Sequence, residues 1–357
     1  MLLPNHGANP SILLKHLGKE QTDSVIDFSE NTNPFGPPAF IKDLNSDQLV
    51  SSIKAYPDPN VTDLTERLAF TNKVPKETIL VGNGAAELIY LIAQLFENKH
   101  VAIVEPAFSE YREACEAFGC DITSIVLPPP WKLDVEKVTS TFSKIEALFI
   151  CSPNNPTGVQ YTEKEIIFLL EEAEKAGVYI ILDEAFYDFS EEGVGLARLQ
   201  RNFSRFIILR SLTKMFAIAG IRLGYLIADK NIIKKVSLYQ PTWSVNGIAQ
   251  HIGLKLLDER SFVTNTVENI HIERRRMTQL LQELDYIVSD SSVNFYLLGE
   301  ETRIDLMPLF MFLVDKGIIA RHTYNFSGLN GAYLRFAVKD RLSNNHLLAA
   351  LSEWRKR

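Results

Sequence analysis

Residues 206–214 read Phe-Ile-Ile-Leu-Arg-Ser-Leu-Thr-Lys, a hydrophobic run that ends in polar residues. The run from Phe206 to Arg210 predicts a buried β-strand, and the residues after it predict a turn at its carboxyl end. Lys214 lies in this turn, three residues after the hydroxyl of Ser211 and eight residues before Arg222. An amine so close to a hydroxyl and a guanidinium indicates a reactive lysine beside an anion-binding site.

Further hydrophobic runs of strand length occur on both sides of this one. They are Thr78–Gly82, Val101–Glu105, Ala147–Cys151, Val178–Asp183 and Gly224–Ala228. Helical patterns such as Ala85–Phe96 and Lys164–Ala176 separate several of these runs. Strands that alternate with helices predict an α/β fold with a parallel sheet.

Polar or glycine-rich turns follow the expected strands. They are Gly82-Asn83-Gly84, Pro106-Ala107-Phe108, the Ser-Pro-Asn-Asn-Pro-Thr-Gly segment at 152–158, Asp183-Glu184, and Ser211-Leu212-Thr213-Lys214. The functional groups of parallel sheets gather at the carboxyl ends of the strands. We therefore expect these turns to converge on one rim of the sheet and to form a single site.

Asp183 ends a hydrophobic strand, where a buried carboxylate is costly unless it is paired. One interpretation is a cap for the following helix. The other is a counter-ion for a protonated pyridine nitrogen, because opposite charges in a low-dielectric site favour each other's ionised forms. Together with Lys214, this second interpretation matches what pyridoxal phosphate (PLP) requires: an amine, an anion cup and a partner for the ring nitrogen.

The cofactor's phosphate needs hydrogen-bond donors. Gly84 and Ala85 open a predicted helix, so their free backbone N–H groups can face an anion. Ser211 adds a hydroxyl, and Arg222 adds a charge with a fork of donors. Taken alone, Gly-Asn-Gly is equally typical of an ordinary turn, and it lacks the Gly-Lys-Ser/Thr ending of a Walker A loop.

Three further side chains have both a site interpretation and an ordinary structural one. Phe108 follows a strand, so it could stack on a flat cofactor ring or pack in the core. Asn155 could donate to a phenolic oxygen on the ring, or simply start a turn before Pro156. Arg335 lies in an alternating strand and could bind a substrate carboxylate bidentately or form a surface salt bridge.

Composition narrows the class of protein. The 357 residues are 46% hydrophobic and 23% charged, which is ordinary for a globular protein with a large and a smaller domain. The net charge of -7 and the lack of a basic stripe argue against nucleic acid as a partner. The N-terminus has no signal-peptide pattern, and no hydrophobic run reaches membrane-spanning length. The number of cysteines is odd, and the spacing of Cys115, Cys120 and Cys151 is typical of free thiols rather than of a metal site. We expect a cytoplasmic protein without a metal.

The pattern of elements changes along the chain. Residues 1–40 hold Pro-rich turns and are expected to form an N-terminal arm that packs on a small C-terminal domain. Residues 41–255 are expected to form the large domain. From 256 onward a long charged helix, about Phe262–Leu284, precedes strands such as Phe295–Leu298, Ile318–Arg321 and Tyr333–Val338, which predicts a small α+β domain.

Taken together, these motifs resemble the fold-type I PLP enzymes of the class I/II aminotransferase superfamily, and the resemblance extends over nearly the whole chain. It implies an aspartate-aminotransferase-like fold: a mostly parallel, mixed seven-stranded sheet in the large domain, plus a small α+β domain. It also implies that Lys214 carries the cofactor, Asp183 pairs with the pyridine nitrogen and Asn155 contacts the ring oxygen. Arg335 is implied to bind the substrate α-carboxylate, while the phosphate of PLP is implied to contact Gly84, Ala85, Ser211 and Arg222.

The same resemblance implies a partner. Members of the superfamily are dimers with shared active sites, so Tyr56 in Tyr56-Pro57-Asp58-Pro59 is expected to reach the PLP phosphate of the neighbouring subunit.

Within the superfamily, the chain resembles the threonine-phosphate decarboxylases of cobalamin biosynthesis and, nearly as well, the histidinol-phosphate aminotransferases. Residues 6–9 (His-Gly-Ala-Asn), 27–36 (Asp-Phe-Ser-Glu-Asn-Thr-Asn-Pro-Phe-Gly), 241–246 (Pro-Thr-Trp-Ser-Val-Asn) and 321–329 favour the decarboxylases. Phe186 also stands where many aminotransferases have a tyrosine. Ala8 departs from the pattern, because it replaces the second glycine of the N-terminal motif.

This resemblance implies decarboxylation of O-phospho-L-threonine to an aminopropan-2-yl phosphate, with a histidinol-phosphate or related aminotransferase as the alternative. The substrate, a phosphorylated amino acid, is expected to contact His6, Gly7, Asn31, Asn33, Asn155, Arg321 and Arg335.

Overall fold

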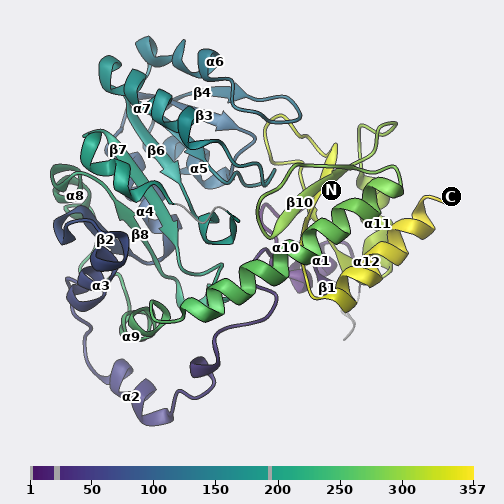
Figure 1. Ribbon diagram of the computed structural model, residues 1–357, viewed down its shortest axis with the longest axis horizontal. Helices are drawn as coiled ribbons and strands as arrows, with labels where there is room; N and C mark the ends of the chain where they lie inside the picture. Colours follow the sequence, from purple (N-terminus) through teal and green to yellow (C-terminus); the bar gives the residue numbers. More distant parts are fainter. Residues whose placement is uncertain (1–2, 20–24, 192–194) are drawn as a thin grey trace.

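The computed structural model describes residues 3–19, 25–191 and 195–357. Two units built on β-sheets lie side by side, and the long helix α10 (Arg260–Glu283) extends from one toward the other (Figure 1). One unit holds a seven-stranded sheet, here called the large sheet, and the other a four-stranded sheet, here called the small sheet.

The large sheet has the strand order β2-β8-β7-β6-β5-β3-β4. Neighbouring strands are parallel except at β8, which is antiparallel to both β2 and β7. The predicted α/β fold with a mostly parallel, mixed seven-stranded sheet is therefore confirmed. The strands are β2 (Ile79–Gly82), β3 (His100–Glu105), β4 (Asp121–Val126), β5 (Ala147–Cys151), β6 (Tyr179–Asp183), β7 (Phe206–Ser211) and β8 (Gly224–Ile227).

Strand β4 is absent from the strands expected from the sequence. It forms one edge of the large sheet, where it pairs with β3, and most of its residues are exposed or half-buried. An edge strand can be largely polar because only one of its sides is covered by a neighbour. The hydrophobic pattern that reveals the central strands is consequently weak in β4.

The antiparallel direction of β8 has a consequence for the site. Gly82 at the end of β2 and Ser211 at the end of β7 both lie opposite Gly224, the first residue of β8. The start of β8 therefore shares an edge with the carboxyl ends of the other strands. Arg222, which comes just before β8, is carried to that same edge.

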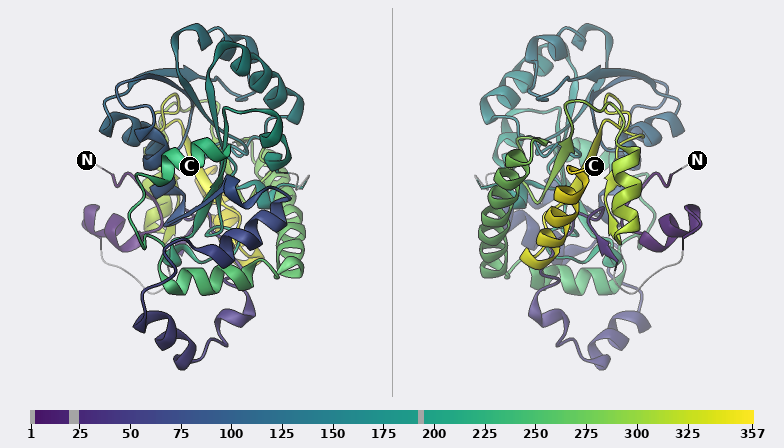
Figure 2. Two further views of the ribbon diagram at one scale, coloured as in Figure 1. Left: turned by 90° about the vertical axis from the view of Figure 1, so that its left-hand side faces the viewer. Right: turned by 90° about the vertical axis from the view of Figure 1, so that its right-hand side faces the viewer.

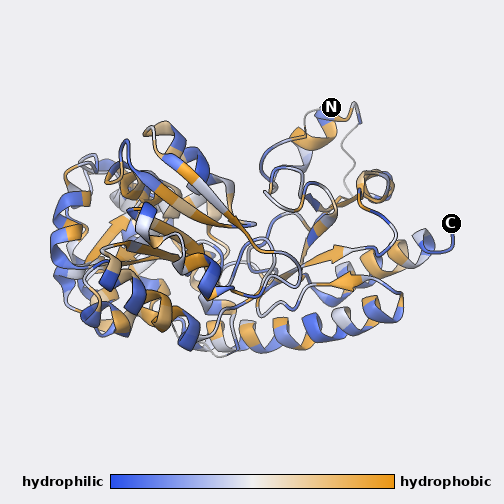
Figure 3. Ribbon diagram, turned by 90° about the horizontal axis from the view of Figure 1, so that it is seen from above, coloured by the Kyte–Doolittle hydropathy of each residue, from blue (hydrophilic) through white to orange (hydrophobic). Residues whose placement is uncertain are grey.

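Helices surround the large sheet, and hydrophobic strands lie inside them while the helices carry hydrophilic residues on their outer sides (Figure 3). The helix α7 begins with a reciprocal cap in which the Thr162 hydroxyl accepts from Glu165 N and the Glu165 carboxylate accepts from Thr162 N. The helices of this unit are α3 (Thr62–Asn72), α4 (Gly84–Gln94), α5 (Ser109–Ala117), α6 (Val135–Thr139), α7 (Glu163–Ala176), α8 (Lys230–Ser237) and α9 (Gly247–Leu256).

The small sheet has the order β12-β13-β10-β9, with antiparallel neighbours. Its strands are β9 (Ile287–Val288), β10 (Phe295–Gly299), β12 (Arg321–His322) and β13 (Tyr333–Ala337). The helices α11 (Met307–Asp315) and α12 (Arg341–Trp354) belong to the same unit.

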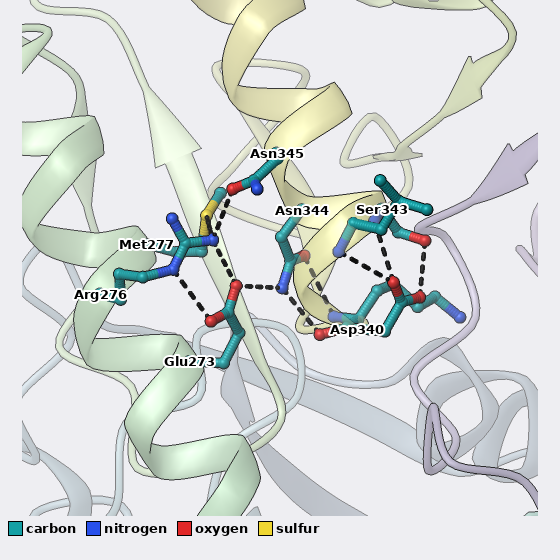
Figure 4. Close-up of polar contacts among 9 residues, drawn as sticks. Glu273, Arg276, Met277, Asp340, Ser343, Asn344 and Asn345 are labelled. Atoms are coloured by element: carbon teal, nitrogen blue, oxygen red, sulfur yellow. Dashed lines mark hydrogen bonds and ion pairs between the residues drawn. The ribbon is translucent and has the colours of Figure 1, made fainter.

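Polar contacts join α10 to α12 (Figure 4). The buried carboxylate of Glu273 on α10 accepts hydrogen bonds from Arg276 and from Nδ2 of Asn344 on α12. The same Asn344 amide donates to the carbonyl of Lys339, close to the Asp340 side chain that caps α12. Because these groups satisfy one another, a charged residue can lie inside the helix contact.

Within the described residues of the predicted arm (residues 1–40), the N-terminal segment packs on the C-terminal unit. After α1 (Pro10–His16), strand β1 (Ile26–Asp27) pairs in parallel with β11 (Ile318–Ile319). Residues 1–2 and 20–24 of that arm lie outside the described residues.

The helix α2 (Ser46–Lys54) projects from the rest of the molecule at the lower edge of both views in Figure 2. Tyr56 follows it with 81% of its surface exposed. Within the ranges that the structure describes, no helix combines the length and the apolar composition needed to cross a membrane.

Candidate active site

A cavity of about 320 Å³ opens where the strand ends of the large sheet meet the small sheet and the N-terminal segment. Most of the residues predicted to form a site line it together, although they come from distant parts of the chain. They are His6, Gly7, Asn31, Ala85, Phe108, Asn155, Asp183, Lys214, Arg222, Arg321 and Arg335.

Lys214 is half-buried in this cavity, between charged groups. Its Nζ donates to the Ser211 hydroxyl at 3.4 Å and lies 6.0 Å from the centre of the Phe186 ring. Burial lowers the pKa of Lys214, and the charge of Asp183 acts in the opposite direction. A lowered pKa makes the neutral, nucleophilic amine more available, as covalent catalysis by a lysine requires.

The carboxylate of Asp183 is 5% exposed at the end of β6. Its Oδ2 accepts a 2.5 Å hydrogen bond from the Tyr111 hydroxyl, and its Oδ1 accepts from Ala185 N at 2.7 Å. Burial raises the pKa of Asp183, while these donors and Lys214 lower it. A buried carboxylate held by donors in this way suits a cationic partner such as a protonated ring nitrogen.

A group of donors lies beside Lys214. Gly84 begins α4 with a φ of +79°, and a Cβ at this position would come within 2.6 Å of Nη2 of Arg222. The left-handed φ favours glycine here, and the absent Cβ leaves room for the guanidinium of Arg222 beside the first turn of α4, where the backbone N–H groups lack partners within the helix. The Ser211 hydroxyl, 2.7 Å from the Thr213 hydroxyl, completes a site suited to a phosphate.

Arg335 on β13 is buried in the wall opposite. Its Nη1 donates to Oδ1 of Asn155 at 2.5 Å and its Nη2 donates to Ser29 O at 2.8 Å. Its Nε is buried without a hydrogen-bond partner among the residues described. Burial, and then the neighbouring Arg321, lower the pKa of Arg335 to about 9, so the group is still cationic at neutral pH.

Arg321 on β12 is a second buried cation, 4% exposed. Its guanidinium donates to Asn5 O, His322 O and Oδ1 of Asn325. Like those of Arg335, these contacts include no carboxylate that would neutralise the charge. Burial lowers the pKa of Arg321 to about 10. Two buried cations whose hydrogen bonds, among the described residues, all go to neutral groups favour an anionic ligand in the cavity.

The N-terminal segment closes one side. Gly7 lies against Ser29 so closely that a Cβ would come within 2.8 Å of the Ser29 carbonyl oxygen. Ala8 has a φ of +66°, the left-handed region that favours glycine, which explains why the resembled motif has glycine there. Asn31 lines the cavity, and its Nδ2 is a buried donor that has no partner within the described part of the chain.

Four predicted residues do not line the cavity. Ser211 is in contact with Lys214, and Gly84 lies beside the guanidinium of Arg222. Asn33 turns away, because its amide donates to Met215 O and to the Thr266 hydroxyl and its oxygen accepts from Phe35 N. Tyr56 is exposed beside α2, and its ring lies 4.6 Å from that of Trp243.

The sequence interpretation missed Tyr111 and Glu110, which both line the cavity. They belong to the first turn of α5, immediately after Phe108. The signal available in the sequence was the position of Tyr111, three residues after Phe108 at the strand end. Nothing in the sequence shows that the Tyr111 hydroxyl contacts Asp183, because 72 residues separate them.

Glu110 also lies near His6 and Glu113. Each of these three residues has one possible metal-ligating atom within 4.8 Å of the other two. His6 and Glu110 also line the cavity. Sequence spacing could not reveal this group, since His6 is far from α5 in the chain. Together with the buried cations, it makes this end of the cavity strongly charged.

The residues present fit PLP. Lys214 offers the amine, Asp183 a buried acceptor for the ring nitrogen, Phe108 a ring face, and Ser211, Arg222 and the first turn of α4 a phosphate cup. The glycine at 84, whose absent Cβ leaves room for Arg222, is the most specific of these features.

Comparison with known proteins agrees with this geometry. Residues 23–351 match the family described as aminotransferase class I and II. The threonine-phosphate decarboxylase of Salmonella typhimurium is 33% identical over 97% of this chain and 95% of its own length. A histidinol-phosphate aminotransferase of Caldanaerobacter subterraneus is 33% identical over 90% of this chain and 91% of its own length.

A solved structure is similar as well. The L-threonine-O-3-phosphate decarboxylase of Porphyromonas gingivalis superposes with a TM-score of 0.83 at 25% identity, covering 92% of this chain and 99% of that one. With the family match spanning most of the sequence, the chain belongs to the class I and II aminotransferase family of PLP-dependent enzymes.

Proposed function

We propose that this enzyme decarboxylates O-phospho-L-threonine to (R)-1-aminopropan-2-yl phosphate. The observation that carries the proposal is the pair of buried guanidinium groups, Arg321 and Arg335, in the cavity that holds Lys214. A substrate with an amine between two anionic groups matches this arrangement of charges. O-phospho-L-threonine has such a structure, with a carboxylate on the carbon that bears the amine and a phosphate on the next carbon.

In this proposal each buried arginine binds one anionic group of the substrate. Arg335 binds and orients the α-carboxylate, with Asn155 and Ser29 O holding its guanidinium in place. Arg321 binds the phosphate, with Asn31 and His6 as further donors at that end of the cavity. PLP, when bound, supplies an electron sink for the pair of electrons that remains on the α-carbon.

Which Cα bond breaks depends on how the chain's own residues orient the substrate, because bound PLP would take up electrons only from a correctly aligned bond. If Arg335 aligned the Cα–COO⁻ bond, this bond would break and carbon dioxide would leave without the bonding electron pair. Lys214 then donates the proton that Cα receives. Because the guanidinium of Arg335 fixes the direction of the carboxylate, it selects the reaction more than Lys214 does.

The identity of Phe186 favours decarboxylation over transamination. It lines the cavity beside Lys214 and has no hydroxyl, so it offers neither a hydrogen bond to the ring oxygen nor a proton relay. A histidinol-phosphate aminotransferase is the second candidate, and the 33% identity to such an enzyme favours it. Histidinol phosphate has a phosphate but no carboxylate, which would leave one buried arginine without an anion in that half-reaction.

The experiment incubates the PLP-loaded protein with O-phospho-L-threonine and measures release of carbon dioxide. A parallel reaction contains histidinol phosphate and 2-oxoglutarate, and glutamate formation is measured. The proposal expects carbon dioxide in the first reaction and no glutamate in the second. The opposite pattern would assign the chain to the aminotransferases instead.

A further inference from the structure

Glu110 is a carboxylate in a cavity that is otherwise suited to anions. The acidic side chains among the described lining residues are Glu30, Glu110 and Asp183. Asp183 faces the cofactor site, and Glu30 accepts a hydrogen bond from Thr32 at 3.1 Å. Among the described residues, Glu110 has a 3.4 Å contact from the Ser109 hydroxyl, a 3.7 Å contact to Nε2 of His6 and a hydrogen bond from its own backbone N–H. A carboxylate so weakly engaged would repel an anionic substrate unless a proton lies between them.

The charged groups around Glu110 come from several elements. His6 faces it from the N-terminal segment and Glu113 from its own helix. Its charge also raises the pKa of Arg321 on β12 and of Lys214 after β7, so it lies within electrostatic reach of both cations. The side chain of Glu110 is only 17% exposed. Burial and then Glu113 raise the pKa of Glu110, while His6 lowers it.

A phosphate monoester differs from other anions in one respect that a carboxylate can detect. Its second pKa is about 6, so near neutral pH it can hold a proton at little cost. The P–OH group can then donate to a carboxylate oxygen, while the remaining oxygens accept from the arginine. A sulfate ester or a second carboxylate has no proton to donate at the same pH and is repelled.

We propose that Glu110 is a specificity-determining residue that accepts a hydrogen bond from the protonated phosphate of the substrate. It thereby selects phosphate monoesters over sulfate esters and dicarboxylic amino acids at the Arg321 end of the cavity. This inference rests on the proposed function for its substrate class and deepens it, because it gives the reason why a phosphorylated substrate is preferred.

The test measures binding of methyl phosphate and methyl sulfate to the PLP-loaded protein by titration calorimetry. The cofactor's own phosphate fills the Arg222 site, and a chelator removes divalent cations that could bridge His6, Glu110 and Glu113. The wild-type protein is expected to bind methyl phosphate at least about tenfold more tightly than methyl sulfate. Its affinity for methyl phosphate should fall as the pH rises above about 6, because the bound ester carries a proton that the free ester loses.

Glu110→Gln tests the residue directly, because an amide can donate to either ester. The preference for phosphate should drop to about threefold or less, mainly through tighter binding of methyl sulfate. Glu116→Gln, further along α5 and with a 60% exposed side chain, is the matched control and should keep the wild-type preference. An unchanged preference in Glu110→Gln, or an equal loss in Glu116→Gln, would overturn the inference.

The result of this binding test is independent of whether the enzyme is a decarboxylase, because neither methyl ester is a substrate that can react. Phosphate selectivity that depends on Glu110, without release of carbon dioxide from O-phospho-L-threonine, would support the inference and reject the decarboxylase. Release of carbon dioxide together with equal binding of both esters would support the decarboxylase and reject the inference. A circular-dichroism melt that matches the wild-type protein confirms that the Gln variant is folded.

Discussion

Nη1 of Arg335 donates a 2.5 Å hydrogen bond to Oδ1 of Asn155, and this contact joins strand β13 of the small sheet to the turn after β5 of the large sheet. The residue expected to hold the substrate carboxylate thus touches the residue expected to contact the cofactor ring. We therefore expect the position of the substrate and the position of the cofactor ring to be coupled through these two side chains.

Replacing Arg335 by Lys tests this arrangement while keeping a positive charge. A lysine cannot form the two parallel bonds of a guanidinium to a carboxylate, nor bridge Asn155 and Ser29 O at once. We expect KM for O-phospho-L-threonine to rise about a hundredfold, in line with the loss of a buried charged hydrogen bond. Steady-state kinetics measures this. Arg303→Lys, with a side chain that is 45% exposed, is the control and should leave KM unchanged.

Replacing Lys214 by Ala should abolish covalent attachment of the cofactor. In the wild-type protein, borohydride reduction should fix PLP on Lys214, and peptide mass spectrometry should find the added mass there. The Lys214→Ala protein should show no added mass, whereas Lys175→Ala, at a 70% exposed side chain, should be labelled like the wild type. Labelling of another lysine in Lys214→Ala would contradict the assignment.

Replacing Asp183 by Asn should stabilise the protein without cofactor. Burial raises the pKa of Asp183 in the folded state above its value of 3.8 in the unfolded chain. The wild-type protein is therefore more stable when Asp183 is protonated, and it loses this stability as the pH rises through the folded-state pKa. Asparagine has no charge to bury, so the melting temperature should exceed that of the wild type by about 2–4 °C near neutral pH.

The difference should shrink as the pH falls through the folded-state pKa and on toward about 3, below the unfolded-state value of 3.8, where the wild-type carboxyl is mostly protonated in both states. Thermal melts of the two apoproteins over this pH range measure it, and binding of PLP should be weaker in Asp183→Asn at every pH. Asp121→Asn at the exposed sheet edge is the control. A pH-independent difference would show that the charge of Asp183 is not its cause.

Replacing Tyr56 by Phe tests the proposed shared site. The family is typically dimeric, and Tyr56 is too exposed to serve its own cavity, so we propose that its hydroxyl binds the cofactor phosphate of the partner subunit. Loss of a hydrogen bond to a charged group should weaken PLP binding about tenfold. Equilibrium dialysis measures the affinity. Tyr239→Phe, which removes another exposed hydroxyl, should have no effect, and equal affinities for all three proteins would remove Tyr56 from the site.

Local sequence was sufficient to predict the central strands of the large sheet and the turns that follow them. Strands such as Ala147–Cys151 and Phe206–Ser211 are mostly hydrophobic because they are covered on both faces. Such a continuous hydrophobic run can be recognised in the sequence alone. Lys214 and Asp183 could be placed at the rim of the sheet for the same reason, since each lies at or just beyond the carboxyl end of a strand.

Tertiary structure alone decided the rest. The edge strand β4 lacks a hydrophobic pattern, the direction of β8 depends on its neighbours, and Asn33 points into the protein because Met215 and Thr266 accept its amide. Likewise, the Tyr111–Asp183 bond, the Arg335–Asn155 contact and the approach of His6 to Glu110 join residues far apart in the chain. The sequence by itself determined which chemical groups the site contains, because residue type and strand periodicity are local properties. Their distances, burial and unneutralised charges arise only when distant segments pack together, so only the folded chain could decide which ligand they favour.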